Sequence, residues 1–72
     1  MERLFVYSME HERTIRLIWQ EEDGCLVQAN VRVTAWDGRN VSFVAQRPKR
    51  VRCVPIERVL SADFRKGDEG EG

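Results

Sequence analysis

The feature that most restricts the fold is a long run of alternating residues followed by a tight-turn signal. From residue 27 to residue 35 apolar and polar side chains alternate with a period of two, the pattern of a strand with one buried face. The pair Asp37-Gly38 then favours a hairpin turn, and residues 41–45 resume the alternation. The sequence therefore predicts an antiparallel hairpin as the centre of a mainly β fold.

Shorter segments flank this hairpin on both sides. Residues 2–12 lack Gly and Pro, and their apolar side chains share one face at helical spacing, so they predict a short helix. Residues 15–20 and 59–64 alternate as strands, and residues 51–54 form a further strand that ends at Pro55. Turns or loops are expected at residues 21–24, 37–38 and 47–50, with one helical turn at 56–58.

The number and length of these elements predict the architecture. A chain of 72 residues has room for one domain, which we place at residues 1–64; the acidic, glycine-rich residues 65–72 are expected to be a disordered tail. A helix followed by five short strands favours a five-stranded antiparallel SH3-like (Sm-like) barrel, because closure removes the exposed edges of a small sheet. The predicted core is Leu4, Phe5, Met9, Ile15, Leu17, Trp19, Val27, Val31, Val33, Phe43, Val51, Ile56, Val59 and Leu60.

Charge is distributed unevenly, although the formal net charge is zero. Residues 32–66 hold nine basic side chains against three acidic ones, between two acidic segments. Basic side chains on one face can neutralise phosphates, and an aromatic side chain beside a turn can stack on a base. The candidate nucleic-acid-binding residues are Trp36, Arg39, Arg47, Lys49, Arg50 and Arg52. The competing interpretation, which the zero net charge favours, is that the basic side chains protect a loop and an edge strand from pairing with other chains.

No arrangement of residues typical of catalysis stands out. His11, the only histidine, lies among acidic neighbours with nothing to orient it as a general base, so we interpret it as exposed. A single histidine without a CxxC spacing argues against zinc, and the isolated Gly24 and Gly38 do not make a phosphate-binding loop. Cys25 and Cys53 are expected to be buried free thiols, with one intrachain disulfide as the alternative. We expect no enzyme activity, metal or cofactor.

The order of segments carries a family resemblance. A short helix, the strand TIRLIW at residues 14–19, a glycine turn, a long strand, a DG turn and the ending VPIERVL at residues 54–60 resemble the YolD-like proteins, over most of residues 4–64. Proteins of that family are bacterial, and many are encoded beside Y-family translesion DNA polymerases. The resemblance implies a small barrel that acts without catalysis as an accessory protein in DNA repair, with a Y-family polymerase as a partner.

The final segment supports a second resemblance. The run IERVLSA at residues 56–62 is similar to the ending of WYL domains, which are also Sm-like barrels preceded by a helix. The Trp-Tyr-Leu triplet expected in the third strand of that family is replaced here by VSFVA at residues 41–45. This resemblance implies a regulatory domain that senses a ligand or a nucleic acid, and it offers no catalytic residue.

Two kinds of function follow from these observations. The first is a non-catalytic binding module that acts through a protein partner, and the alternative is direct nucleic-acid binding or WYL-like ligand sensing. No apolar run approaches the length of a membrane span and no signal peptide is evident, so we expect a cytoplasmic protein without membrane partners. The sequence leaves the partner's identity and the oligomeric state open.

Overall fold

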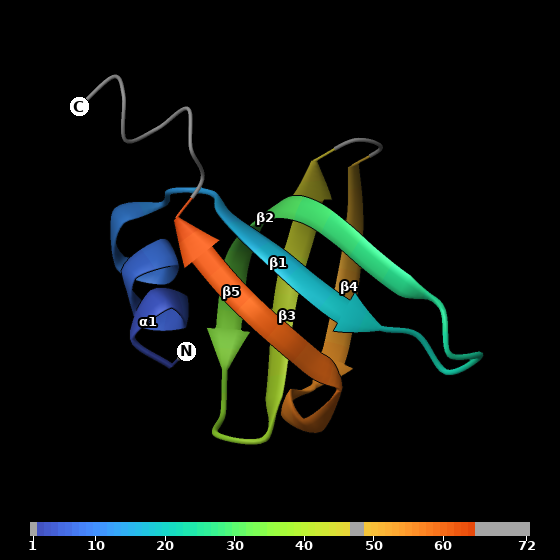
Figure 1. Ribbon diagram of the computed structural model, residues 1–72. Helices are drawn as coiled ribbons and strands as arrows, with labels where there is room; N and C mark the ends of the chain where they lie inside the picture. The colour runs from blue at the N-terminus through green and yellow to red at the C-terminus, as the bar shows by residue number, and fades with distance from the viewer. Residues whose placement is uncertain (1, 47–48, 65–72) are drawn as a thin grey trace.

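The computed structural model describes residues 2–46 and 49–64 of the chain. The elements are α1 (Glu2–His11), β1 (Ile15–Gln20), β2 (Leu26–Trp36), β3 (Asn40–Gln46), β4 (Lys49–Pro55), the 3₁₀ turn η1 (Ile56–Arg58) and β5 (Val59–Phe64). The strands form one antiparallel sheet in the order β4-β3-β2-β1-β5 (Figure 1). The predicted fold class, a short N-terminal helix followed by five antiparallel strands, is confirmed.

The long strand β2 gives the sheet its curvature. Its first half pairs with β1, its second half pairs with β3, and Figure 1 shows it bending between these two neighbours. Within the described part of the chain, β4 pairs only with β3 and β5 pairs only with β1. The predicted closure of the barrel is therefore not confirmed, because no ladder joins β4 to β5 and both strands remain edges.

A bulge in β2 reverses the alternation of its side chains. The register against β3 shifts between Val33 and Ala35, so Thr34 is an extra residue in this strand. Before the bulge Val33 is buried, whereas after it Ala35 is exposed and Trp36 is half-buried. Trp36 packs against Phe5 of α1, with ring centroids 4.9 Å apart. Strict alternation along β2 would place Trp36 on the outer face of the sheet, but the bulge turns its ring towards α1.

Helix α1 covers the part of β2 that β1 leaves without a neighbour. Because β1 begins at Ile15, opposite Val31, the last residues of β2 extend beyond it, and α1 lies beside them. The fully buried Ser8 joins the two elements: its Oγ accepts a hydrogen bond from the backbone N–H of Val33 (2.9 Å) and donates one to the carbonyl of Arg13 (2.6 Å). One serine thus satisfies a strand amide that faces no other strand.

The end of α1 has the backbone conformation of a glycine cap without a glycine. Glu12, which follows the last helical residue, has a φ of 53°, in the left-handed region. The N–H of Arg13 then donates to the carbonyl of Ser8 at 3.2 Å, which is the hydrogen bond of a Schellman cap. The helix therefore ends one residue before the predicted boundary.

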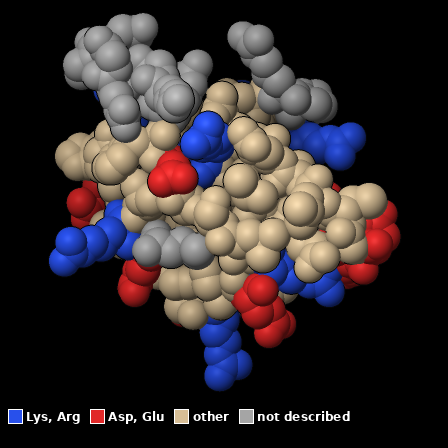
Figure 2. Space-filling model, in the orientation of Figure 1, with Lys and Arg blue, Asp and Glu red and all other residues tan. Residues whose placement is uncertain are grey.

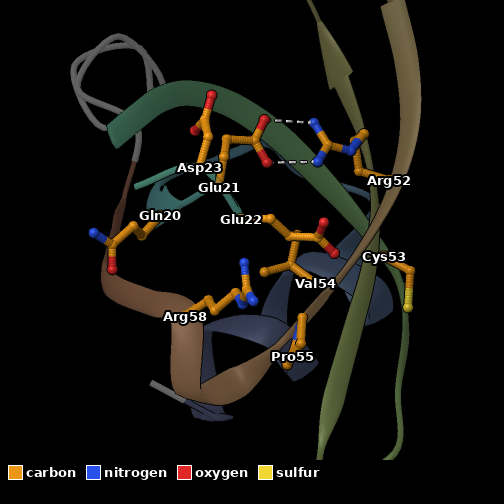
Figure 3. Close-up of a pocket in the computed structure, with 9 residues that line it drawn as sticks. All are labelled: Gln20, Glu21, Glu22, Asp23, Arg52, Cys53, Val54, Pro55 and Arg58. Carbon is orange, nitrogen blue, oxygen red and sulfur yellow. Dashed lines mark hydrogen bonds and ion pairs between the residues drawn. The ribbon is translucent and has the colours of Figure 1, made fainter. Parts of the chain in front are cut away.

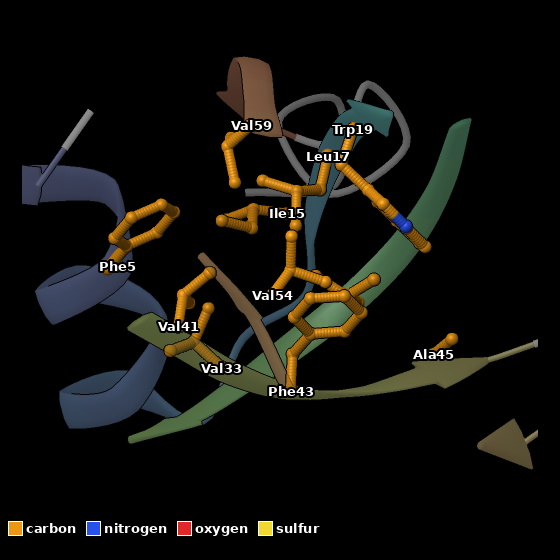
Figure 4. Packing of buried hydrophobic residues seen from close by; sticks show 11 residues of the cluster. Phe5, Ile15, Leu17, Trp19, Val33, Val41, Phe43, Ala45, Val54 and Val59 are labelled. Atoms are coloured by element: carbon orange, nitrogen blue, oxygen red, sulfur yellow. The ribbon is translucent and has the colours of Figure 1, made fainter. Parts of the chain in front are cut away.

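The core matches the prediction along β1 and at Val31 and Val33 of β2, whereas four other residues predicted to be core are only half-buried: Leu4, Met9, Val27 and Ile56. The buried apolar residues that pack into one cluster are Phe5, Ile15, Leu17, Trp19, Val31, Val33, Val41, Phe43, Ala45, Val54 and Val59 (Figure 4). Val44 is also buried but does not belong to this cluster. Val51 and Leu60, both predicted to be core, are 77% and 51% exposed. Val54 lies opposite the buried Val41, so the inward positions of β4 are the even-numbered ones and Val51 points outward. In β5 the inward position is taken by Val59, and Leu60 points away from the core.

Candidate functional site: the open end of the sheet and the edge strand β4

The structure distributes the predicted basic cluster over both faces of one strand. Lys49, Arg50 and Arg52 all belong to β4, although residues 49 and 50 were expected in a loop, and Arg47 lies outside the described residues. Successive side chains of a strand point to opposite faces, so Lys49 lies on the face opposite Arg50 and Arg52. On the face seen in Figure 2, basic and acidic side chains are interspersed rather than gathered into a single basic patch.

The other two candidates lie apart from β4. Arg39 is exposed in the turn between β2 and β3, and the ring of Trp36 is engaged by Phe5. Asp37 fixes this turn, because its Oδ1 accepts hydrogen bonds from the N–H groups of Arg39 (2.8 Å) and Asn40 (2.7 Å). These hydrogen bonds hold the pKa of Asp37 below its ordinary value. The conformation of this turn is thus fixed by the hydrogen bonds of Asp37. The turn does not bring Trp36 and Arg39 together with the cations of β4.

An ion pair that sequence reasoning missed lies at one end of the sheet. Arg52 donates from Nη1 to Oε2 of Glu21 (3.0 Å) and from Nη2 to Oε1 (2.7 Å), so the two groups bind each other bidentately (Figure 3). Glu21 follows β1 and Arg52 lies in β4, two strands that are not neighbours in the sheet. The side chains are 29% and 32% exposed, respectively. This pair therefore joins the β1–β2 turn to the far side of the curved sheet.

The ion pair shifts the titration of both partners. The hydrogen bonds from Arg52 lower the pKa of Glu21 below its ordinary value, and the same contact raises the pKa of Arg52. The exposed Arg50 adds a smaller electrostatic contribution to the lowered pKa of Glu21. Both shifts favour the charged forms of the pair.

The pair lines two hollows. The larger, of about 510 Å³, lies against the β1–β2 turn and η1, and Figure 3 shows Arg58 extending into it. Its lining residues are Gln20, Glu21, Glu22, Asp23, Arg52, Cys53, Val54, Pro55 and Arg58. The smaller, of about 330 Å³, has a more apolar wall and is lined by Trp19, Glu21, Val27, Gln28, Ala29, Ala45, Arg50 and Arg52. Glu21 and Arg52 belong to both.

Trp19 forms the floor of the smaller hollow. Its ring packs against Phe43, with centroids 4.9 Å apart, and the Cζ of Arg52 lies 5.9 Å from the ring centroid. The side chain is only 2% exposed, and its Nε1 has no hydrogen-bond partner within the described part of the chain. A weak hydrogen bond from the Trp19 side chain nevertheless contributes to the lowered pKa of Glu21, so this carboxylate is a partner of the indole N–H in a geometry poorer than that of an ordinary hydrogen bond. A buried donor that is satisfied only poorly is unusual, and a closer acceptor in this hollow would satisfy it better.

The edge strand β4 presents an apolar side chain to solvent beside its cations. Among the described residues Val51 is the most exposed large hydrophobic side chain, and Cys53, two residues further on and on the same face, is a free, exposed thiol. Cys25 is also free and exposed, so the prediction that both thiols are buried is wrong. One edge of β4 has no strand paired to it within residues 2–46 and 49–64. The backbone groups along that edge are available to another strand.

The remaining reactive groups do not converge. His11 is exposed at the end of α1, with its ring 5.1 Å from that of Tyr7. Among the described residues, no group of three or more His, Cys, Asp or Glu side chains could hold a metal ion, and no helix is long and apolar enough to cross a bilayer.

The chain matches no family model, no curated protein and no solved structure. The resemblances to YolD-like proteins and WYL domains therefore stay predictions.

Proposed function

We propose that this protein is a non-catalytic binding module that takes up an extended segment of a partner protein along β4. The observation that carries the proposal is the open edge of β4, with Val51 77% exposed at its centre. An extended segment can pair with such an edge through main-chain hydrogen bonds, while its side chains give specificity. An edge protected against pairing usually presents charge at its centre, whereas the centre of β4 presents a valine.

The charges of β4 indicate the chemistry of the partner. Strand β4 includes three cations and no acidic side chain, and of these cations only Arg52 has an acidic partner within hydrogen-bond distance among residues 2–46 and 49–64. Lys49 and Arg50 are both exposed and directly precede Val51 in the sequence. Electrostatic complementarity then favours a segment in which apolar residues alternate with Asp or Glu. We therefore assign to β4 an acidic, strand-forming segment of another protein.

The test uses two designed eight-residue peptides, one alternating Val with Glu and one alternating Val with Lys. The Val-Glu peptide should shift the backbone amide signals of β4 in a ¹H–¹⁵N correlation spectrum, and the Val-Lys peptide should not. V51K should abolish the shifts because it places a charge at the centre of the edge. The matched control is L26K, since Leu26 is also a large exposed hydrophobic residue (64%) but lies at the start of β2. Equal shifts with both peptides, or none with either, would contradict the proposal.

A second copy of the chain is the competing occupant. Edge β5 exposes Leu60 and Phe64 and could pair with β4 of another molecule. Sedimentation of the wild type and V51K at increasing concentration separates the two occupants. A wild-type dimer that V51K dissociates, together with no response to the Val-Glu peptide, would assign the edge to self-association and overturn the proposal of a foreign partner.

The YolD-like resemblance supplies a specific partner to test. If it holds, the segment belongs to a bacterial Y-family polymerase and the module is an accessory protein in DNA damage tolerance. The test is whether a Y-family polymerase encoded beside this gene shifts the β4 signals, and whether V51K removes that response while L26K retains it. The lack of such a neighbouring gene, or shifts confined to other elements, would remove the polymerase but leave the peptide proposal standing.

Direct nucleic-acid binding is the second candidate, favoured by the exposed cations Lys49 and Arg50. Affinity for single-stranded DNA should then fall steeply as salt is raised, because phosphate contacts release counterions. Replacing both residues with Ala should flatten that salt dependence by about two units. If no saturable binding occurs at low salt, the cations of β4 do not form a nucleic-acid site.

A further inference from the structure

The position of the Glu21 carboxylate has the features of an oxyanion site that is filled by a residue of the chain itself. Two N–H groups of Arg52 hold the carboxylate bidentately at 2.7 and 3.0 Å. The buried N–H of Trp19, which lines the same hollow, makes only a weak hydrogen bond to this carboxylate, and Arg50 adds positive charge. Three donors thus face one carboxylate, but Glu21 satisfies only the two N–H groups of Arg52 with good geometry.

The surroundings fit a small ligand that carries both a carboxylate and an apolar body. The hollow has a volume of about 330 Å³, within the range of sites for small molecules. Its wall combines Val27, Ala29 and Ala45 with the polar groups already described. A planar carboxylate matches the fork of the Arg52 guanidinium, and an apolar ring would lie against these short side chains.

We propose that this hollow binds a small aromatic or aliphatic carboxylate, which replaces Glu21 on Arg52 and accepts a hydrogen bond from the Trp19 indole. Glu21 then acts as an internal competitor that occupies the site in the free protein. No bond is made or broken in this exchange, and the Glu21 side chain moves into solvent, from which it is only partly shielded. The site uses the inward side chains of β4 and does not depend on a strand pairing with its open edge.

The experiment is a titration with sodium benzoate, followed through the indole N–H signals in a ¹H–¹⁵N correlation spectrum. W36F assigns the two indole signals. For a ligand with this number of atoms we expect dissociation constants of about 1–10 mM. The Trp19 signal should move downfield as its N–H gains an acceptor, and neutral benzamide should leave it in place. Phenyl phosphate distinguishes the source of the oxyanion: if it binds and benzoate does not, the carboxylate assignment is wrong.

Variants separate the exchange from a purely structural role of the ion pair. E21Q removes the competing charge, so benzoate should bind about fivefold more tightly than to the wild type. R52M should abolish binding, and R39M, which changes a cation that lines a different hollow, should leave it unchanged. Far-UV circular dichroism establishes that each variant is folded. If R52M does not fold, the E21Q comparison decides: folded E21Q that binds no more tightly than the wild type would refute the proposal.

Discussion

Replacing Ser8 with Ala tests the account of how α1 is attached to the sheet. The Ser8 hydroxyl is fully buried and makes two hydrogen bonds, one of them to the amide of Val33 in a stretch of β2 that β1 does not cover. The substitution removes both hydrogen bonds. Loss of the one to the Arg13 carbonyl costs about 1 kcal/mol, and the Val33 amide, left buried without an acceptor, costs about 1–3 kcal/mol more. The better helix propensity of Ala offsets about 0.5 kcal/mol of this. We expect a net loss of about 1.5–3.5 kcal/mol from a total stability of about 4–10 kcal/mol.

Urea unfolding monitored by circular dichroism measures this loss directly. The control is S61A, at a half-buried serine on the edge strand β5, which should change the free energy of unfolding by less than about 0.5 kcal/mol. Hydrogen exchange adds local resolution, since the Val33 amide should lose protection in S8A more than the amides of β3 do. An S8A variant as stable as S61A would refute the reasoning and would mean that Val33 finds another acceptor.

Three further predictions follow from the fold and the ion pair. Because Glu12 has a positive φ, which glycine adopts without strain, E12G should raise the free energy of unfolding by about 1 kcal/mol. The control E12A removes the same carboxylate but keeps a Cβ atom at the strained position, so it should not raise the free energy of unfolding, and urea unfolding of both variants measures the difference. Because Phe43 is fully buried against Trp19, F43A should lower the free energy of unfolding by about 3–5 kcal/mol, and a loss below about 1 kcal/mol in the same assay would contradict its place in the core. The pKa of Glu21 is lowered in the folded state, so its pairing with Arg52 stabilises the fold above the unfolded-state pKa of about 4.3 and is lost as pH falls through the folded value. The difference in urea midpoint between the wild type and E21Q should therefore shrink as the pH is lowered from about 6 to about 3, a range that spans the ordinary pKa of Glu. A difference that stays constant over this range would contradict the pairing.

Local patterns were sufficient for the order of elements. The alternation along β2 and the Asp37-Gly38 turn predicted the central hairpin, and the break at Pro55 predicted the helical turn before β5. The same patterns failed to predict which face a side chain occupies where one extra residue shifts the alternation of the strand. Thr34 is an ordinary strand residue, and nothing in its identity marks the bulge that turns Trp36 towards α1.

The candidate site could not be predicted in the same way, because its main contact joins residues from distant parts of the chain. Glu21 reads as a solvated turn residue and Arg52 as one member of a basic run. Their pairing depends on the curvature of the sheet, which brings the β1–β2 turn over β4. The poorly satisfied N–H of Trp19 could not be predicted for the same reason, since alternation predicts that the ring is buried but not what its N–H faces.

The place of β5 in the sheet has a consequence for how the chain folds. The ladders β1–β2, β2–β3 and β3–β4 join consecutive strands, whereas β5 pairs with β1 from the opposite end of the described chain, so that Ile15 meets Phe64. Closing so long a loop costs more entropy than closing a hairpin, and we expect this step to come after the rate-limiting barrier. A V59A variant in stopped-flow experiments should then unfold faster than the wild type while refolding at nearly the same rate. The first and last strands would thus set the lifetime of the native state, and the central meander would set the speed at which it forms.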